Sequence, residues 1–230
     1  MKPKKRIVAL LPLKANSERV KGKNFKLLAG KPLYQWILDA LLSLDEIDLV
    51  VINTDARDIL EQTGLLESDR VVIRDRAPAL RGDLVSMNLI LEDDIKHVPA
   101  DIYLMTHTTN PLLGPSTIRD AMTQFVDSDS KDSLFSVNKI QTRFYREDLT
   151  AVNHDPAELV RTQDLEPWFE ENSCLYIFSK ESFFETNARI GKVPILFVTP
   201  ALESIDIDEI DDWVVAEALA LHQSRNLNPE

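Results

Sequence analysis

Apolar runs alternate with amphipathic segments along the first 140 residues of the chain. Continuous apolar stretches are typical of strands buried on both faces of a parallel sheet, and apolar residues at helical spacing indicate amphipathic helices. Strands are therefore expected at 6–13, 48–55, 70–75, 101–107 and 132–140, and helices between them at 32–44, 56–64, 85–98 and 114–126. Strands that alternate with helices predict βαβ units with right-handed crossovers, hence an α/β fold with a mostly parallel sheet.

The pattern changes after residue 140. Residues 141–172 are polar and irregular, with a possible hairpin, and connections this long usually serve a function. We interpret them as an insertion that acts as a dimerisation element or a lid; an ordinary long surface connection is the alternative. Strands at 174–179 and 195–200 and a helix at 208–223 then resume the α/β pattern. With 230 residues, 44% of them hydrophobic, the sequence predicts a single domain over 1–230.

The charge of the chain is strongly uneven. The formal net charge is -12, which argues against a general nucleic-acid binder. Yet residues 1–31 hold ten of the 26 Lys and Arg residues and only one of the 38 Asp and Glu residues. The excess of positive charge therefore lies around the end of the first predicted strand.

Cysteine content and hydropathy indicate the compartment. Cys174 is the single cysteine of the sequence, so no disulfide can form within the chain, which fits a reducing environment. No apolar run approaches the roughly 20 residues of a membrane span. We expect a cytoplasmic protein that does not contact a membrane.

The basic segment 14–25 has the position and the chemistry of a phosphate-binding loop. Ligands of open parallel sheets bind beyond the carboxyl ends of the strands, where this segment follows the first strand. Its lysines and Arg19, together with Gly22 and the backbone amides, suit a polyphosphate. The segment has neither the Walker A pattern nor the G-x-G-x-x-G dinucleotide pattern. A solvated basic loop is the alternative.

The acidic segment "ESIDIDEIDDW" (203–213) is a candidate metal site. In an extended segment Asp206 and Asp208 point to the same side. Divalent cations in phosphate chemistry are held by one or two such carboxylates. The alternative is helix capping, because negative charge is favoured at the start of the last helix. Both interpretations can hold together, with Glu209 and Asp212 capping the helix.

Five blocks, in order, resemble the nucleotide-sugar cytidylyltransferases, above all the CMP-sialic acid synthetase (acylneuraminate cytidylyltransferase) family. The blocks are "PLKANSERVKGKNFKLLAGKPL" (12–33), "RAPALRGDLVS" (76–86), "HTTNPLL" (107–113), "QDLEPWFEENSCLYI" (163–177) and "SIDIDEIDDW" (204–213). Residues 17–23 also resemble the related CMP-KDO synthetases. The chain departs from the family pattern by having Lys14 in place of arginine, His107 in place of glutamine, Asn110 in place of serine, Leu113 in place of arginine and Ser173 in place of glycine.

The resemblance implies a three-layer, Rossmann-like fold of the nucleotide-diphospho-sugar transferase type and a homodimer formed through 141–172. It also implies Mg²⁺ as cofactor, bound by Asp206 and Asp208. The catalytic residues implied are Lys14, Lys23, Asp206 and Asp208. The nucleotide-binding residues implied are Leu13, Lys14, Ser17, Lys23, Asn24, Arg76 and Ser86. The sugar-binding residues implied are His107, Thr108, Thr109, Asn110, Arg161, Asn172 and Tyr176.

The activity implied is transfer of CMP from CTP to the anomeric hydroxyl of a sialic acid-like 2-keto sugar acid, with release of pyrophosphate. A CMP-KDO-type synthetase, another sugar nucleotidyltransferase and a non-catalytic nucleotide-binding relative are the alternatives. His107 is a candidate general base, although a lone histidine is more often structural. Arg161 is a candidate for the sugar carboxylate, across a dimer interface, and Tyr176 is either a pocket residue or core.

Overall fold

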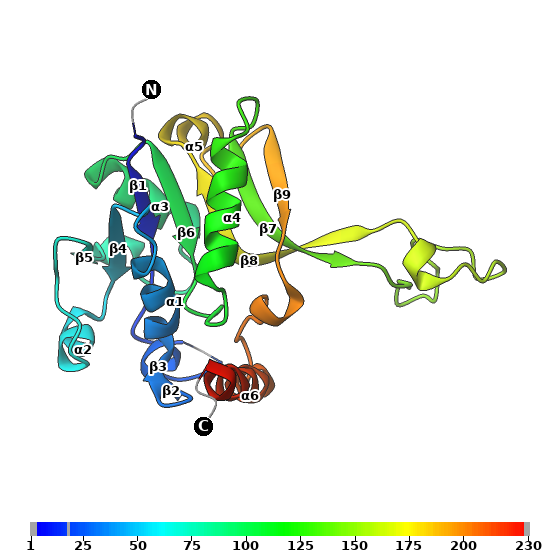
Figure 1. Cartoon of the computed structure of the whole chain (residues 1–230), viewed down its shortest axis with the longest axis horizontal. Coiled ribbons are helices and arrows are strands. Elements are labelled where there is room, and N and C mark those ends of the chain that lie inside the picture. The colour runs from blue at the N-terminus through cyan, green and yellow to red at the C-terminus, as the bar shows by residue number, and fades with distance from the viewer. Residues whose placement is uncertain (1–3, 18, 228–230) are drawn as a thin grey trace.

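A seven-stranded sheet forms the centre of the computed structural model, which describes residues 4–17 and 19–227 (Figure 1). Its strand order is β5-β4-β1-β6-β8-β7-β9. The strands are β1 (Ile7–Leu10), β4 (Leu49–Thr54), β5 (Val71–Asp75), β6 (Ile102–Thr106), β7 (Ser133–Ile140), β8 (Trp168–Phe178) and β9 (Pro194–Val198). β8 runs antiparallel to β6 and β7, whereas the other neighbours pair in parallel. The prediction of a mostly parallel sheet is confirmed.

Helices connect the strands close to where the apolar spacing predicts them. They are α1 (Leu33–Leu42), α2 (Arg57–Gln62), α3 (Met87–His97), α4 (Pro115–Val126), α5 (Lys180–Thr186) and α6 (Ile210–Leu227). The pattern missed α5, which has seven residues and begins where the Ser179 hydroxyl accepts a hydrogen bond from the Ser182 amide at 3.1 Å. None of the helices in the described ranges is long and apolar enough to cross a membrane.

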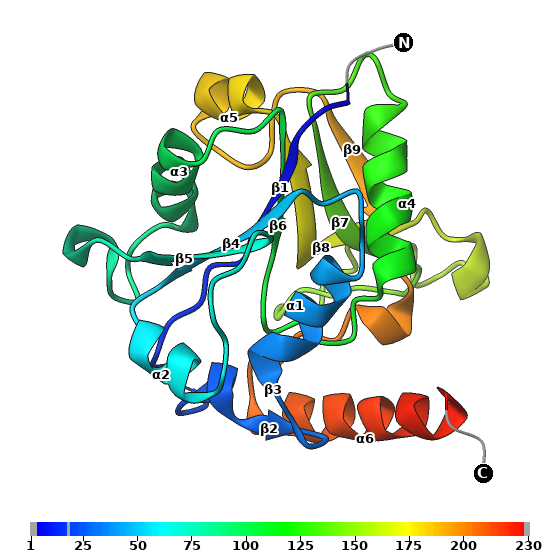
Figure 2. The same ribbon diagram turned by 60° about the vertical axis from the view of Figure 1, so that its left-hand side comes forward.

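Two apolar layers cover the sheet and make the fold three-layered (Figure 2). Ala9 and Leu11 of the first strand segment point into a core shared with α1 and α4. Their neighbours Val8 and Leu10 point into the opposite core, shared with α3 and α5. Because successive side chains of a strand alternate between faces, a continuous apolar run is needed to fill both layers.

A third apolar cluster joins two segments that are far apart in sequence. Leu28 and Leu33 pack against Ile207 and Trp213, which flank the start of α6. Leu28 lies in β2 (Leu27–Leu28), which pairs with β3 (Lys31–Pro32) as a small antiparallel ribbon. This packing brings the basic loop beside the acidic segment, as Figures 1 and 2 show for β2, β3 and α6.

The segment between β7 and β8 projects from the body as an arm (Figure 1). The arm, residues 141–167, contains a β-bridge between Tyr145 and Ala151, which agrees with the hairpin the sequence suggests. The predicted boundary at 172 is wrong, because Trp168 to Glu171 already pair with β7. These four residues are exposed, so no core-facing apolar period marks them as a strand.

Candidate active site

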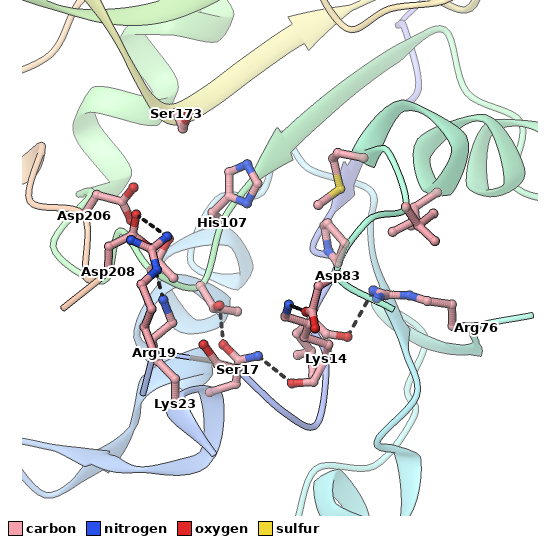
Figure 3. A pocket seen from close by; sticks show the side chains of 18 of the residues that line it. Lys14, Ser17, Arg19, Lys23, Arg76, Asp83, His107, Ser173, Asp206 and Asp208 are labelled. Atoms are coloured by element: carbon pink, nitrogen blue, oxygen red, sulfur yellow. Dashed lines mark hydrogen bonds and ion pairs between the residues drawn. The ribbon is translucent and has the colours of Figure 1, made fainter. Parts of the chain in front are cut away.

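A cavity of about 540 Å³ opens beyond the carboxyl ends of β1 and β6. Its lining comes mainly from the loop after β1, the residues between β5 and α3 with the start of α3, the loop after β6 and the segment before α6. Ser173 of β8 and Arg189 of the loop after α5 complete it. Figure 3 shows Asp206, Asp208, Arg19 and Lys23 on one side, Lys14, Asp83 and Arg76 on the other, and His107 between them. The position is where an open parallel sheet binds its ligands.

Lys23 is the most enclosed cation of the basic loop. Gly22 precedes it with φ of 62°, a left-handed conformation that glycine adopts without strain, and a short 3₁₀ turn then begins at Lys23. The Lys23 side chain is 9% exposed. Its Nζ donates to the Ile207 carbonyl at 2.5 Å and lies 3.4 Å from Asp208 Oδ1. Basic loop and acidic segment are therefore in direct contact.

Two other cations of the cavity also have carboxylate partners. Arg19 Nη2 lies 3.1 Å from Asp208 Oδ2, and its Nη1 donates to Glu209 Oε1 at 3.3 Å. Lys14 forms an ion pair with Asp83 on the opposite side of the cavity from Lys23. A triphosphate would compete with these carboxylates for the same ammonium and guanidinium groups, because both are bound by charge-assisted hydrogen bonds.

Asn24 shapes the loop rather than facing the cavity freely. Its Nδ2 donates to the Lys14 carbonyl at 2.8 Å, and its Oδ1 accepts from the Thr108 hydroxyl at 2.6 Å. These two bonds tie the loop after β1 to the loop after β6. Lys14 and Thr108 thereby acquire fixed positions in the cavity wall.

Arg76 is buried beside the cavity, where a network of hydrogen bonds fixes its guanidinium. Nε donates to Asn53 Oδ1 at 2.9 Å, and Nη2 donates to the carbonyls of Leu13 at 3.1 Å and Asn53 at 2.8 Å. Burial lowers the pKa of Arg76, which the charges of Asp55 and Asp94 partly oppose. Arg76 lines the cavity, and its Nη1 donates no hydrogen bond to the described residues.

The two carboxylates of the acidic segment have the chemistry of a cation site. Ile207 is buried in the third cluster, so its neighbours Asp206 and Asp208 face the cavity. Asp206 Oδ1 is buried without a hydrogen-bond partner among the described residues. Burial raises the pKa of Asp206; a hydrogen bond from Thr109 opposes this, and the charge of Asp208 adds to it. A bound cation would relieve both the orphan oxygen and the repulsion, so the pair fits Mg²⁺.

No group of three or more His, Cys, Asp or Glu side chains in the described part of the chain is arranged to hold a metal ion. Asp206 and Asp208 would therefore supply two ligands, and phosphate oxygens and water would complete the shell. This is the usual manner of binding Mg²⁺ in nucleotide chemistry, where the ion keeps waters and substrate oxygens.

His107 lies in the middle of the cavity as a neutral imidazole. Burial lowers its pKa to about 3, and the positive charges of Arg189 and Lys23 act in the same direction. At neutral pH the ring therefore offers one nitrogen as a donor and the other as an acceptor. A group with so low a pKa is a weak proton acceptor, which does not favour His107 as the general base.

Comparison with known protein families finds one that covers almost the whole chain. Residues 8–227 match the family model described as cytidylyltransferase. The chain belongs to the cytidylyltransferase family. It is 28% identical over 226 residues to an N-acylneuraminate cytidylyltransferase of Oncorhynchus mykiss, covering 95% of this chain and 51% of that protein. It is 29% identical over 226 residues to the CMP-N,N'-diacetyllegionaminic acid synthase of Legionella pneumophila, covering 93% of this chain and 96% of that protein.

Among solved structures, the chain resembles a CMP:2-keto-3-deoxy-manno-octonic acid synthetase in complex with CTP. The TM-score is 0.66 at 15% sequence identity, and the match covers 95% of this chain and 99% of that chain. At this identity the likeness concerns the fold. The chain spans about half the length of several of the curated relatives it matches, such as the two N-acylneuraminate cytidylyltransferases of Danio rerio, at 53% and 51%.

Most of the expected site residues lie together. The cavity brings together the expected residues Leu13, Lys14, Ser17, Lys23, Asn24, Arg76, His107, Thr108, Thr109, Asp206 and Asp208. Ser86 is exposed at the entrance to α3 and lines an adjoining cavity instead.

Four expected sugar-binding residues do not line this cavity. Asn110 belongs to the loop after β6, but its side chain is buried, and its Nδ2 donates to the Ile205 carbonyl at 3.4 Å. Asn172 is buried on β8, and its Nδ2 donates to Asn138 Oδ1 of β7 and to Thr199 Oγ1, just after β9. The placement of both in the pocket is wrong, because a strand or loop next to a cavity also has a side that faces the core.

The other two residues are Tyr176, for which the structure agrees with the core alternative, and Arg161, which was expected to act across a dimer interface. Tyr176 is fully buried in the core on the α3 side of the sheet, and only its hydroxyl approaches the cavity, through Ser173 at 3.2 Å. Arg161 lies on the arm, where its Nε donates to Asp164 Oδ2 at 2.6 Å. Within one chain, Arg161 is therefore not part of the cavity.

Other cavity residues are absent from the expected set. Arg19 and Asp83 lie inside two of the sequence blocks that carry the family resemblance. Their charge and their position in these blocks could have identified them as site residues. Arg189 lines the cavity from the loop after α5, a region without any motif. Only folding brings this arginine to the site.

Proposed function

We propose that the chain transfers CMP from CTP to the anomeric hydroxyl of a sialic acid-like 2-keto sugar acid, releasing pyrophosphate. The observation that carries the proposal is the meeting of Lys14, Arg19 and Lys23 with Asp206 and Asp208 in one cavity of a cytidylyltransferase-family chain. The names of the similar proteins, which include N-acylneuraminate and legionaminic acid enzymes, support this class of acceptor.

The cations would bind the triphosphate and neutralise the charge that develops on it. Lys14 and Lys23 approach from opposite sides of the cavity, and Arg19 offers the planar fork that binds phosphate oxygens bidentately. Because the loop is already tied through Asn24, these donors need little reorganisation when the substrate arrives. Arg76, with Nη1 free, would donate to the nucleoside on the Lys14 side.

Asp206 and Asp208 would hold Mg²⁺, which when bound polarises phosphate oxygens and neutralises their charge. The segment that carries them is fixed by the Ile207 amide, which donates to the Thr109 carbonyl at 2.8 Å. This hydrogen bond links the segment that would hold the metal to the loop that carries His107 and Thr109. Neutral His107 would accept a hydrogen bond from the acceptor hydroxyl and orient it for attack.

We also propose that the arm joins two copies of the chain into a homodimer and that the protein functions in the cytoplasm. Leu149 and Leu159 on the arm are 82% and 88% exposed, as expected of residues that a partner would cover. A partner's arm would also give Arg161 access to a cavity, where it would bind the sugar carboxylate. The lone Cys174 is a buried free thiol, consistent with a reducing compartment.

The test is pyrophosphate release with CTP, Mg²⁺ and a panel of 2-keto sugar acids. The wild-type chain should release pyrophosphate only when an acceptor is present. Asp206→Asn and Asp208→Asn should each abolish pyrophosphate release. The circular dichroism spectrum of each variant, recorded without CTP, should match that of the wild type. Asp39→Asn, which breaks a surface ion pair with Lys31 at 2.7 Å, is the matched control and should keep full activity. Full activity in either site variant would refute the metal assignment.

A further inference from the structure

Arg76 is the last of three buried side chains that hydrogen bonds join in series, and the series begins outside the cavity. Asp94 on α3 and Asn53 in β4 are both fully buried. Asn53 Nδ2 donates to Asp94 Oδ1 at 2.8 Å, and Asn53 Oδ1 accepts from Arg76 Nε at 2.9 Å. One side-chain amide therefore connects a carboxylate of the helix to the guanidinium that lines the cavity. We call these three side chains the relay.

The two neighbours of Asn53 fix the direction in which its amide points. An ionised carboxylate such as that of Asp94 only accepts hydrogen bonds, and the Nε–H of Arg76 only donates. Turning the amide over would place two acceptors face to face at one end and two donors at the other. Because Asn53 is fully buried, water could not compensate for the lost bonds. Asp94 therefore determines which atom of Asn53 faces Arg76.

Both ends of the relay are held by further contacts. Arg74 forms an ion pair with Asp94 through Nη1, and its Nη2 lies 2.9 Å from Asp93 Oδ2. At the other end, Arg76 Nη2 donates to the carbonyls of Asn53 and Leu13. Asn53 thus supplies two of the three acceptors of the Arg76 guanidinium. Nη1 is the nitrogen left for a ligand, since it donates to none of the described residues.

The relay is more polar than its place in the core requires. Leu91 and Ile95, on the same helix as Asp94, pack in the apolar core together with Val51 of β4. Asp94 Oδ2 is buried without a hydrogen-bond partner among the described residues. An apolar side chain would often serve packing at least as well as a buried charge. Departures from such packing rules are typical of residues that serve a site.

We propose that Asp94 and Asn53 are positioning residues for nucleotide binding: Asp94 orients the Asn53 amide, and this amide holds Arg76 in place for the nucleoside of CTP. The inference rests on the proposed function, in which Arg76 contacts the nucleoside. The phosphate-binding lysines are held by other contacts, Lys14 through Asn24 and Lys23 through the Ile207 carbonyl. Breaking the relay should therefore weaken binding of the nucleoside and leave binding of the phosphates unchanged.

The experiment measures two affinities by calorimetric titration with Mg²⁺ at pH 7.5. One is for CTP, and the other is for inorganic tripolyphosphate, which probes the phosphate-binding residues alone. Asp94→Leu and Asn53→Ala each break the relay and should each weaken CTP binding by about tenfold. Tripolyphosphate binding should keep its wild-type affinity in both variants.

Two further variants distinguish a hydrogen bond from a charge. Asp94→Asn is the conservative variant, because its amide oxygen can still accept from Asn53, and it should recover most of the CTP affinity that Asp94→Leu loses. Asp93→Asn is the matched control, because Asp93 also binds Arg74 and lies next to Asp94 on α3. It should bind both ligands as the wild type does.

A measurement on the wild type needs no altered side chain and keeps the test valid if the relay variants fail to fold. The side-chain amide of Asn53 is observed by NMR in the ¹⁵N-labelled protein. CTP should shift its resonances, although Asn53 is buried behind Arg76, whereas tripolyphosphate should not. Resonances that CTP leaves unshifted would overturn the inference.

The outcomes also separate the inference from the function on which it rests. Parallel loss of CTP and tripolyphosphate affinity would show a general loosening of the site and overturn the relay. Unchanged CTP affinity in Asp94→Leu and Asn53→Ala would do the same, as would a loss in Asp94→Asn as large as in Asp94→Leu. Absence of pyrophosphate release with every acceptor, from a protein whose CTP binding follows the expected pattern, overturns the proposed transfer alone.

Discussion

Asp94 makes the stability of the fold depend on pH in a direction opposite to that of an ordinary surface carboxylate. Its side chain is fully buried on α3. Oδ1 accepts from Asn53 Nδ2 at 2.8 Å and forms an ion pair with Arg74, while Oδ2 has no hydrogen-bond partner among the described residues. Burial is the largest effect and raises the pKa of Asp94 from its ordinary value of 3.8 to about 6; Asn53 and Arg74 oppose it.

The sign and the size of the effect follow from this pKa. Below pH 3.8 the carboxyl is protonated in both the folded and the unfolded chain. Between pH 3.8 and about 6 the folded chain keeps a proton that the unfolded chain has released, so the free energy of unfolding falls as pH rises. The gap between the two pKa values corresponds to about 3 kcal/mol, which is lost once the pH exceeds 6.

The perturbation is Asp94→Asn, which removes the titrating group and keeps its shape. Urea unfolding at pH 4, 5, 6 and 7 gives the free energy of unfolding of both proteins. The wild type should lose about 2–3 kcal/mol relative to the variant between pH 4 and pH 7. Asp93→Asn is the matched control, because Asp93 also binds Arg74, at 2.9 Å. It should retain the wild-type dependence, and a difference between wild type and Asp94→Asn that is constant across pH would refute the reasoning.

Three further predictions concern the cavity and the arm. Lys23→Met removes the enclosed ammonium that would face the triphosphate, so kcat/KM for CTP in steady-state assays should fall by about 100-fold or more; a loss below threefold would contradict its role. Asp83→Asn frees Lys14 from a half-exposed ion pair, so calorimetric titration should show CTP binding strengthened up to about fivefold, and weakened binding would contradict the competition described above. Replacing both Leu149 and Leu159 by Ser should halve the mass measured by light scattering, whereas an unchanged dimer would exclude the arm as its interface.

The parts of the fold that local spacing specifies were predictable. The apolar run at 7–10 fills two layers, so its pattern already distinguishes a buried strand from a surface one. The direction of β8 was not predictable in the same way, because periodicity carries no information about which way a strand runs. Apolar periodicity also fails to identify the start of β8 at Trp168, which is exposed, and α5, which is too short to show a helical period.

The site was also predictable only in part. Four of its residues could be identified because charges of one sign gather in short stretches of the sequence: Lys14, Lys23, Asp206 and Asp208. The contact between these stretches depends on the cluster around Ile207, whose members lie more than 170 positions apart, from Leu28 to Ile207.

Contacts between distant segments were not predictable from the sequence. Arg76 was expected as a nucleotide-binding residue, but its hydrogen bonds to Asn53 and to the Leu13 carbonyl were not. Arg189 follows no motif, and its ion pair with Glu171 of the fourth block joins two different elements. Such pairs form only when the sheet is assembled, because nothing in either segment alone calls for a charge of the other sign.

The proposed activity of this cavity is the transfer of CMP from CTP to a sugar acid. Its most direct test is mass spectrometry of the products formed with Mg²⁺ and each of the four ribonucleoside triphosphates, with sialic, legionaminic, pseudaminic and KDO acids as acceptors. We expect a CMP-linked sugar acid and an equal amount of pyrophosphate, from CTP and one or more acceptors. Tight CTP binding with no nucleotide-linked sugar from any acceptor would contradict it.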